Sequence, residues 1–207
     1  MYAIYCAGDQ GRVVRDIVQA SDKNERLVFV DDNPELHGTE IGGIPVVGGL
    51  DYVSNRSQTS FHVAYGSTAG NRTDIAARIE KAGFSFFNAI HPDATISESA
   101  NLGEGVAINA QSYVGPGSDV GDHVLIDSCV NISHDSALGD GVTVTPNVGI
   151  AGNVTIEAGA YVGPGAVVFK GTTIGRGAVV GGGAVVTSDV EPETEVRGIP
   201  AKSIDDR

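Results

Sequence analysis

The sequence predicts two domains of different fold class: an α/β domain over residues 1–86 and an all-β parallel β-helix over residues 87–192, followed by a tail over residues 193–207. Two patterns support this prediction. From Ile90 to Val186 an aliphatic residue returns at every sixth position, a period that neither a helix nor a plain strand produces. Before Ile90, short apolar runs alternate with amphipathic helical stretches, which is typical of an α/β domain.

The first domain begins with a strand, a tight turn and a helix. YAIYC (2–6) is a short apolar run, AGDQG (7–11) forms the turn, and RVVRDIVQAS (12–21) places its apolar residues on one side of a helix. We expect a second strand over 26–30, a looped stretch over 32–49, a third strand over 61–67 and a helix over 71–83. This order is that of half a Rossmann unit.

The glycine turn of this unit is an incomplete dinucleotide fingerprint. Cys6 stands where the first glycine would be, so only Gly8 and Gly11 remain. Two glycines before a helix can still hold a phosphate through backbone N–H groups, and the carboxylates of Asp31 and Asp32 after the second strand can hold a ribose or a base. Ordinary packing of βα turns is the alternative.

The hexapeptide repeat predicts the second domain. Four places after each aliphatic residue stands a small or β-branched residue, from Ala94 to Val190. Three such units close a triangular coil that buries its aliphatic residues and stacks on the next coil at roughly 4.8 Å. The seventeen units therefore make between five and six coils.

One pair of residues interrupts the Gly, Ala, Val and Ile of the repeat. His134 and Asp135 follow Ile132 at a predicted corner and should face outward. One coil further on, the equivalent of His134 is Gly152, which leaves a bare backbone beside the imidazole. A proton acceptor next to a peptide N–H is the arrangement that acyl transfer requires. The alternative is that His134 is a solvated turn residue.

Composition excludes several partners. Against 26 Asp and Glu stand 13 Lys and Arg, and the net charge of −13 repels nucleic acid and anionic membranes. We find no basic, apolar leader and no apolar run long enough to span a membrane. Cys6 and Cys129 fall in different domains, as in proteins of a reducing cytoplasm. From this cysteine usage we expect a cytoplasmic protein. His123 and His134 fall on different faces of the predicted prism, so we also expect no metal site.

Taken together, these stretches resemble the NeuD/PglD-like sugar O- and N-acetyltransferases over nearly the whole chain. The stretches that carry the resemblance are CAGDQGRVV, FVDDNP, IGGIPVVGG, AYGSTAGNR, SCVNISHDSALGDGV, AGNVTIEAGAYVGPGAVV and RGIPAKSI. The resemblance implies a left-handed β-helix, acetyl-CoA as co-substrate, a nucleotide-sugar substrate, and a homotrimer with active sites between subunits.

Residue roles follow from the same resemblance. His134 would be the general base and Asp135 would orient it, while Gly152, Thr143, Gly182 and Pro200 would bind acetyl-CoA. The substrate would lie against Gly8, Gly11, Asp31, Asp32, the Gly66 to Arg72 turn and Asp127. This chain departs from the family pattern at Thr143, where a second His is common, at Asp127 and Ser128, and at Asp9 and Gln10.

Three functions stay open from the sequence. The leading one is N-acetylation of a nucleotide-linked amino sugar, in particular a 4-amino-4,6-dideoxy sugar. The second is O-acetylation of sialic acid or a related sugar. The third is a non-catalytic trimer that binds a nucleotide sugar.

Overall fold

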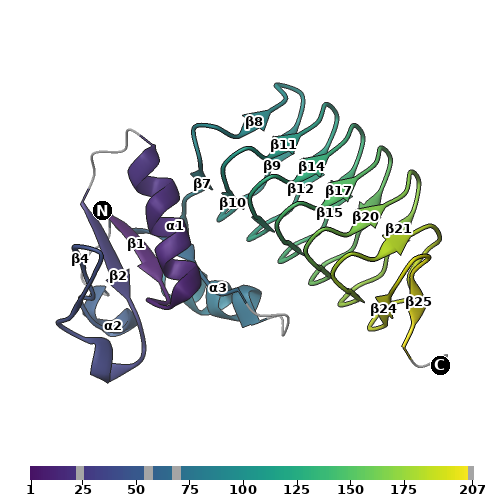
Figure 1. The fold of residues 1–207 in the computed structure, drawn as a ribbon. Helices are drawn as coiled ribbons and strands as arrows, with labels where there is room; N and C mark the ends of the chain where they lie inside the picture. Colours follow the sequence, from purple (N-terminus) through teal and green to yellow (C-terminus); the bar gives the residue numbers. More distant parts are fainter. Residues whose placement is uncertain (22–25, 54–57, 67–70, 205–207) are drawn as a thin grey trace.

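The structure is a computed structural model and describes residues 1–21, 26–53, 58–66 and 71–204. A small α/β domain leads into a long β-helix whose coils run away from it toward the C-terminus (Figure 1). This is the predicted order of domains, and the predicted fold class is confirmed. Among the described residues, no helix is long and apolar enough to cross a membrane.

The first domain is a parallel sheet in the order β2-β1-β5-β6, with helices on both faces. α1 packs with Ile4 and Phe29 on one face, while Ala3 and Val28 join the core on the other face, which includes Ile79 of α3. This alternation follows from the two-residue period of a strand. The elements are β1 (Tyr2–Tyr5), α1 (Asp9–Ala20), β2 (Leu27–Val30), a 3-10 turn η1 (Pro34–Leu36), β3 (Glu40–Ile41), β4 (Ile44–Pro45), α2 (Leu50–Val53), β5 (Ser60–Val63), α3 (Asn71–Lys81) and β6 (Ser85–Phe86).

Two details of this domain differ from the sequence prediction. α1 begins at Asp9, three residues before the predicted start at Arg12, with Gly8 as its N-cap. The predicted loop contains η1 and the β3–β4 hairpin. Residues 67–70, within the predicted Gly66 to Arg72 turn, lie outside the described residues.

The β-helix has three faces, each a sheet of very short strands that pair in parallel, except that residues 195–197 and 202–203 pair antiparallel at the C-terminal end of one face. Strands of one face pair at an offset of one coil, as Ile132 does with Val114 and Ile150. The repeated aliphatic side chains fill the prism and are almost fully buried from Val106 onward. We name the faces by their number of strands.

The strands of each face are these. The eight-stranded face contains β7 (Ala89–Ile90), β10 (Ala107–Ile108), β13 (Leu125–Ile126), β16 (Thr143–Val144), β19 (Tyr161–Val162), β22 (Val179–Val180), β24 (Glu195–Arg197) and β25 (Lys202–Ser203). The six-stranded face contains β8 (Thr95–Ile96), β11 (Tyr113–Val114), β14 (Asn131–Ile132), β17 (Gly149–Ile150), β20 (Val167–Val168) and β23 (Val185–Val186). The five-stranded face contains β9 (Asn101–Leu102), β12 (Asp119–Val120), β15 (Ala137–Leu138), β18 (Thr155–Ile156) and β21 (Thr173–Ile174).

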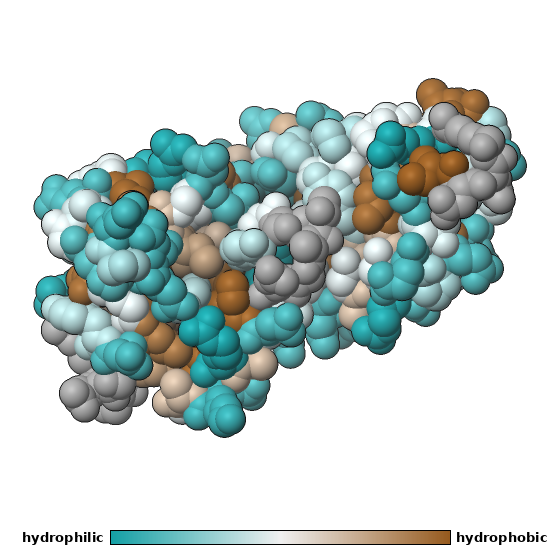
Figure 2. All heavy atoms as spheres, turned by 90° about the horizontal axis from the view of Figure 1, so that it is seen from below, coloured by the Kyte–Doolittle hydropathy of each residue, from teal (hydrophilic) through white to brown (hydrophobic). Residues whose placement is uncertain are grey.

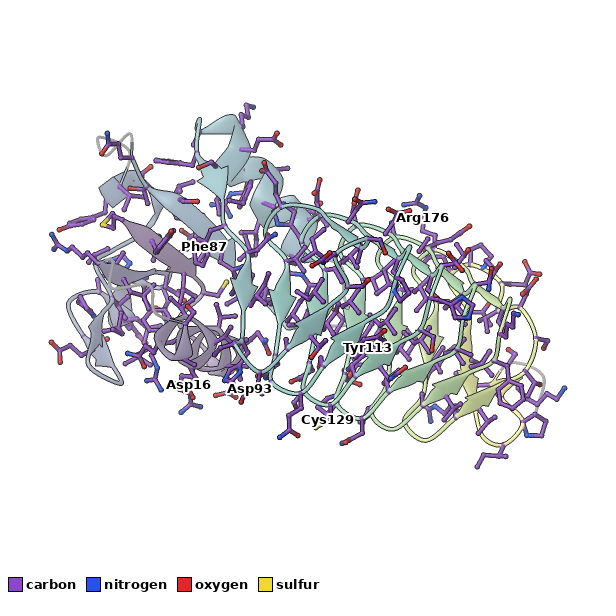
Figure 3. All side chains as sticks on the ribbon, turned by 90° about the horizontal axis from the view of Figure 1, so that it is seen from above. Asp16, Phe87, Asp93, Tyr113, Cys129 and Arg176 are labelled. Atoms are coloured by element: carbon purple, nitrogen blue, oxygen red, sulfur yellow. The ribbon has the colours of Figure 1, made fainter. Side chains whose placement is uncertain are left out.

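The first domain docks on the eight-stranded face. Ala107, Leu125 and Thr143 are residues of that face that precede a core aliphatic residue, yet all three are buried. Equivalent residues on the other faces, such as Tyr113 and Val167, are exposed. In Figure 3, Tyr113 and Cys129 lie on one side of the prism and Arg176 on the opposite side, as the triangular cross-section requires.

Candidate active site

A reactive corner forms where the chain passes from the six-stranded to the five-stranded face, between β14 and β15. His134 and Asp135 occupy it, and both side chains are about half exposed, 51% and 61%. His134 Nδ1 lies 2.7 Å from Asp135 Oδ2. A carboxylate on Nδ1 holds the proton there, so that Nε2 carries the free lone pair. The predicted pair is thus arranged as a base and the residue that orients it.

Gly152 lies directly against the imidazole, in the next coil. A Cβ built on Gly152 would stand 2.5 Å from His134 Nε2, and Asn153 N–H donates to the His134 carbonyl at 3.0 Å. Within the part of the chain that the structure describes, no group accepts the Gly152 N–H. Any residue with a side chain at this position would crowd Nε2.

Other corners close this position with a carboxylate. Asp122 Oδ1 accepts the Glu104 N–H at 2.8 Å, and Asp140 Oδ1 accepts the Asp122 N–H at 2.9 Å. One coil beyond Gly152 stands Lys170, whose ammonium group cannot accept a hydrogen bond from the Gly152 N–H. The Gly152 N–H is therefore left open beside the Nε2 lone pair, which is a base next to an oxyanion donor.

Lys170 was missed by the sequence reasoning. It stands two coils beyond His134 at the same corner position, at a separation of about 10 Å if each coil adds one strand spacing. Counting one further coil from Gly152 would have found it. A cation on an acidic chain with a net charge of −13 provides a local attraction for a phosphorylated ligand.

Apart from the reactive corner, a cavity of about 560 Å³ lies at the carboxyl ends of β1, β2 and β5, where ligands bind in open α/β sheets. It brings together three of the predicted substrate residues: Gly8, Asp31 and Gly66. Sequence reasoning did not include Tyr65, which also lines it. The full lining is Cys6, Gly8, Asp9, Gln10, Asp31, Ala64, Tyr65 and Gly66. We name it the sheet-edge cavity.

Hydrogen bonds to the backbone hold the Asp31 carboxylate in place in the wall of the sheet-edge cavity. Asp31 Oδ2 accepts the Ala7 N–H at 2.7 Å and its Oδ1 accepts the Asn33 N–H at 2.9 Å. Gly8, the N-cap of α1, lines the cavity together with Asp9 and Gln10 of the first helical turn, so the positive end of the helix dipole borders the cavity. Burial, together with the charges of Asp31 and Asp32, raises the pKa of the Cys6 thiol to about 12. Cys6 is therefore a neutral thiol and no nucleophile at neutral pH.

Two predicted substrate residues of this domain lie outside the cavity lining. Gly11 is buried in α1, and a Cβ there would stand 2.3 Å from the Cys6 carbonyl oxygen, so its role is close packing. The Asp32 carboxylate accepts a hydrogen bond from the Tyr5 hydroxyl at 2.5 Å and from Arg78 at 3.0 Å. These hydrogen bonds hold the pKa of Asp32 below its usual value.

Arg72 and Thr143 differ most from the sequence prediction. Both lie in the seam between the domains, with exposed fractions of 6% and 4%. Arg72 Nη2 donates to Thr143 Oγ1 at 3.0 Å. In the single chain the docked first domain buries both side chains, which leaves neither exposed at a surface, and their contact with substrate and acetyl-CoA stays a prediction.

Asp127, Gly182 and Pro200 lie on a different edge of the prism from His134. They occur where the chain leaves the eight-stranded face, after β13, β22 and β24. Asp127 Oδ1 accepts hydrogen bonds from Asn109 Nδ2 at 3.1 Å and the Ser128 N–H at 2.7 Å. One chain therefore does not bring these three residues to the reactive corner.

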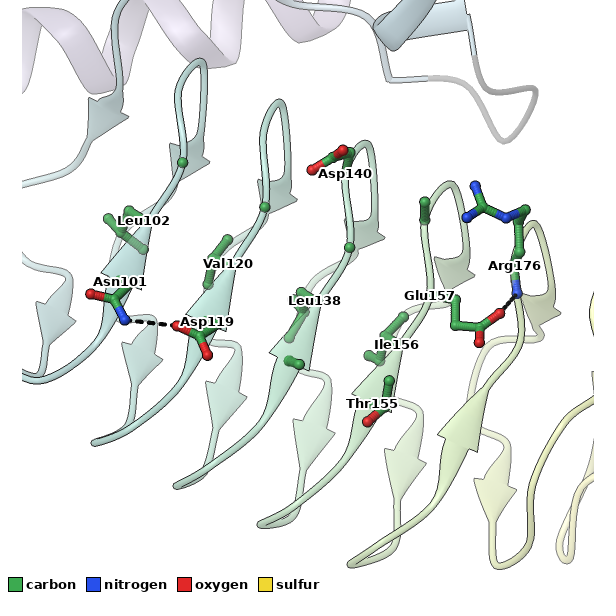
Figure 4. A pocket seen from close by; sticks show the side chains of 15 residues that line it. Asn101, Leu102, Asp119, Val120, Leu138, Asp140, Thr155, Ile156, Glu157 and Arg176 are labelled. Carbon is green, nitrogen blue, oxygen red and sulfur yellow. Dashed lines mark hydrogen bonds between the residues drawn. The ribbon is translucent and has the colours of Figure 1, made fainter.

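A shallow hollow of about 850 Å³ lies on the five-stranded face (Figure 4). Two hydrogen bonds lie within its wall: Asn101 Nδ2 donates to Asp119 Oδ1 at 2.7 Å, and the Arg176 backbone N–H donates to Glu157 Oε2 at 2.8 Å. It includes neither His134 nor Gly152. No cluster of His, Cys, Asp and Glu among the described residues could hold a metal ion.

Comparisons with known proteins match both domains. Residues 2–79 match the PglD N-terminal domain family. The acetyltransferase domain of PglB from Neisseria gonorrhoeae, solved with acetyl coenzyme A, is 32% identical, with 98% of each chain covered and a TM-score of 0.92. PerB from Caulobacter crescentus, solved with CoA and GDP-perosamine, is 32% identical over 98% of this chain and 96% of that chain, with a TM-score of 0.90.

A third similar structure is WeeI from Acinetobacter baumannii, 25% identical over 99% of both chains, with a TM-score of 0.78. No curated protein sequence matches the chain at a significant level. The similarity to all three structures extends over both domains, so it includes the reactive corner and the sheet-edge cavity alike.

Proposed function

We propose that this chain transfers the acetyl group of acetyl-CoA to the amino group of a nucleotide-linked amino sugar. It belongs to the sugar acetyltransferases that join a PglD N-terminal domain to a hexapeptide β-helix, and it is therefore an acetyltransferase. The observation that carries the proposal is His134 Nε2 lying against the bare backbone of Gly152. The Caulobacter relative is named a perosamine N-acetyltransferase. We propose a 4-amino-4,6-dideoxy sugar as the acceptor here too.

The reactive corner supplies what the transfer needs. A sugar amine is largely protonated near neutral pH, so a free base must form before it attacks the thioester carbonyl. As the new C–N bond forms, His134 Nε2 takes a proton from the amine and the Gly152 N–H donates to the oxyanion. When the intermediate collapses, the C–S bond breaks, and the CoA thiolate takes the proton from the imidazolium.

Direct attack, without an acyl-enzyme, is consistent with the positions of the cysteines. Cys6 is in the first domain, and Cys129 is at the edge between the eight- and six-stranded faces. Neither lies at the reactive corner. Asp135, 2.7 Å from Nδ1, stabilises the imidazolium that forms during transfer.

The acceptor's nucleotide would occupy the sheet-edge cavity, with a phosphate at the N-terminus of α1 and the Asp31 wall beside the ribose or base. Acetyl-CoA would reach the reactive corner from the C-terminal side, where Lys170 follows Gly152 on the same corner. Opposite charge attracts the phosphates of CoA to that side of an otherwise acidic chain.

We further propose that the enzyme is a homotrimer with its sites between subunits. The first domain packs on the N-terminal part of the eight-stranded face, and the reactive corner is the prism edge opposite that face. A nucleotide sugar held by the first domain therefore meets the His134 of a neighbouring chain more readily than its own. Asp127, Gly182 and Pro200, which lie on another edge, could then complete the neighbour's acetyl-CoA groove.

The exposed apolar residues are consistent with such an assembly. Val167, Phe169 and Ile199 are 41%, 48% and 77% exposed. Hydrophobic side chains gather at the C-terminal end of the β-helix (Figure 2). Apolar surface of this kind is a common mark of a protein interface.

The test is thiol release from acetyl-CoA by the purified protein with UDP-, dTDP- and GDP-linked 4-amino-4,6-dideoxy sugars, and with free sialic acid. We expect release with one nucleotide amino sugar and an amide product. His134→Ala should lower kcat by about 10² to 10⁴ and leave acetyl-CoA binding unchanged. Glu98→Ala, at the same corner position two coils earlier, is the matched control.

Other outcomes would change the proposal. Turnover of sialic acid alone, with an ester product, would assign O-acetylation instead. Full activity of the His134→Ala variant would remove His134 as the base. Thiol release that no acceptor in the panel stimulates would count against the substrate class.

A further inference from the structure

Arg72, the second residue of α3, is the centre of the seam between the two domains. Its guanidinium donates to five acceptors: Nε to the His123 carbonyl at 2.7 Å, Nη1 to the Tyr65 carbonyl at 2.8 Å, and the two N–H groups of Nη2, one of them shared, to three acceptors of residues 141–143. The three distances from Nη2 are 2.8 Å to the Gly141 carbonyl, 3.1 Å to the Val142 carbonyl and 3.0 Å to Thr143 Oγ1.

None of these partners is a carboxylate. Burial lowers the pKa of Arg72 to about 10, so the side chain remains a cation near neutral pH. A buried cation without a counter-ion contributes little net stability compared with an apolar residue of similar size. The arrangement instead fixes geometry. Because the guanidinium is rigid and planar and bonds to five fixed acceptors, it permits one relative placement of the two domains.

The acceptors belong to both halves of the proposed active site. Tyr65 follows β5 and lines the sheet-edge cavity. Residues 141–143 continue the same coil that carries His134, between β15 and β16. One guanidinium therefore links the wall of the nucleotide cavity to the catalytic coil.

Other contacts of the seam are less directional. The His123 ring meets Phe86 edge-on, with ring centroids 4.5 Å apart. His123 Nδ1 and Gln10 Nε2 are buried and have no hydrogen-bond partner among the described residues. Such contacts resist separation of the domains, but they tolerate sliding more readily than the fork of Arg72 does.

We propose that Arg72 is a positioning residue for acetyl transfer, which holds the sheet-edge cavity at a fixed offset from the coil of His134 so that a nucleotide-bound amine arrives at the thioester in line for attack. The inference rests on the proposed function. In a symmetric assembly, an offset fixed within each chain also fixes the distance between one chain's cavity and its neighbour's base. A displacement of about 1 Å can cost on the order of 10² in rate.

The test compares Arg72→Ala and Arg72→Lys with Lys81→Ala, an exposed cation on the same helix. For Arg72→Ala we expect kcat/KM for the nucleotide amino sugar to fall about 100-fold. The KM for acetyl-CoA and the Kd of the nucleoside diphosphate alone should stay within about twofold, because Arg72 lines no part of the described sheet-edge cavity. Lys81→Ala should match the wild type.

A truncated acceptor separates positioning from general damage. Acetylation of the amino sugar without its nucleotide does not use the first domain, so its slow rate should be equal in Arg72→Ala and in the wild type. Added guanidinium ion, at millimolar concentration, should restore part of the lost activity, whereas ammonium ion should not. Arg72→Lys should recover little, since one ammonium cannot reach acceptors in both domains.

Three results would overturn the inference: unchanged kcat/KM with the nucleotide sugar, an equal loss with the truncated acceptor, or a nucleotide Kd raised in proportion to the loss. If the wild type acetylates no nucleotide sugar, the proposed function fails by itself. Amide hydrogen exchange then tests the seam: Arg72→Ala should accelerate exchange at residues 141–143 and not at Val167–Val168. Unchanged exchange would remove Arg72 from the role.

Discussion

At the scale of single residues, the reactive corner depends on the missing side chain at Gly152. We predict that Gly152→Ala lowers kcat by on the order of 10²-fold, because a Cβ 2.5 Å from His134 Nε2 must push the imidazole off its position. Steady-state kinetics with the accepted amino sugar would measure the loss. Gly149→Ala, in the same coil but with open space around its Cβ, should keep full activity. Equal activity of the two variants would contradict this account.

Asp135 combines a chemical and a backbone requirement. It contacts His134 Nδ1 and its φ is 56°, a left-handed conformation that Asp and Asn tolerate better than Ala. Asp135→Asn should therefore lower kcat about tenfold through the lost charge, and Asp135→Ala should lower it further and also reduce thermal stability. If Ala were the milder change in both assays, the orienting role would be wrong.

At the scale of elements, the β-helix depends on its buried aliphatic columns. Ile132 is fully buried in β14 and stacks between Val114 and Ile150. Ile132→Ala should lower the free energy of unfolding by about 2 to 5 kcal/mol, from lost burial and the cavity left behind, as measured by denaturant unfolding. Val167→Ala on the same face, where the side chain is 41% exposed, should change it far less.

The sheet of the first domain should respond to acid through His62. This residue of β5 is buried, its Nδ1 lies 3.3 Å from the Phe87 carbonyl, and burial lowers its pKa to about 4, helped by the nearby charge of Arg72. A free His titrates near 6.5, so the unfolded chain binds the proton more tightly than the folded chain does. The contribution of neutral His62 to the free energy of unfolding should therefore be fully present above about pH 6.5. It should be lost as the pH falls toward 4, by about 3 kcal/mol in all.

His62→Gln tests this expectation, since glutamine does not titrate. Its unfolding free energy should vary less between pH 6.5 and pH 4 than that of the wild type. The comparison is needed because carboxylates also titrate in that range, and because burial lowers the pKa of His123 in the seam as well. Parallel curves for the two proteins would show that His62 contributes nothing.

At the scale of the whole molecule, the prism separates the two parts of the proposed site. The first domain packs on the N-terminal part of one face and His134 occupies the opposite edge. We predict that His134→Ala and Asp31→Ala chains, each inactive alone, regain activity when co-expressed. Random mixing would make about a quarter of the sites complete if each site joins two chains. Thiol release by mixed assemblies purified through two different tags measures this, and no recovery would place the whole site within one chain.

The sequence determined the fold and the position of Gly152 beside His134. A strict period of six can bury its aliphatic residues only in a three-sided coil, and the coil count then places Gly152 beside His134 without further information. The same count would also have found Lys170. These are local consequences of one repeating unit, so they can be derived from spacing alone.

Only the tertiary structure decided which groups surround Arg72, Thr143, Gly11 and Asp32. Their surroundings come from segments far apart in the chain: Arg72 bonds to residues up to 71 positions away. How one domain docks on another depends on the fit of whole surfaces, and the spacing of residues along the sequence does not predict that fit. For the same reason the seam, the sheet-edge cavity and the separation of that cavity from His134 became visible only when the two domains were seen together.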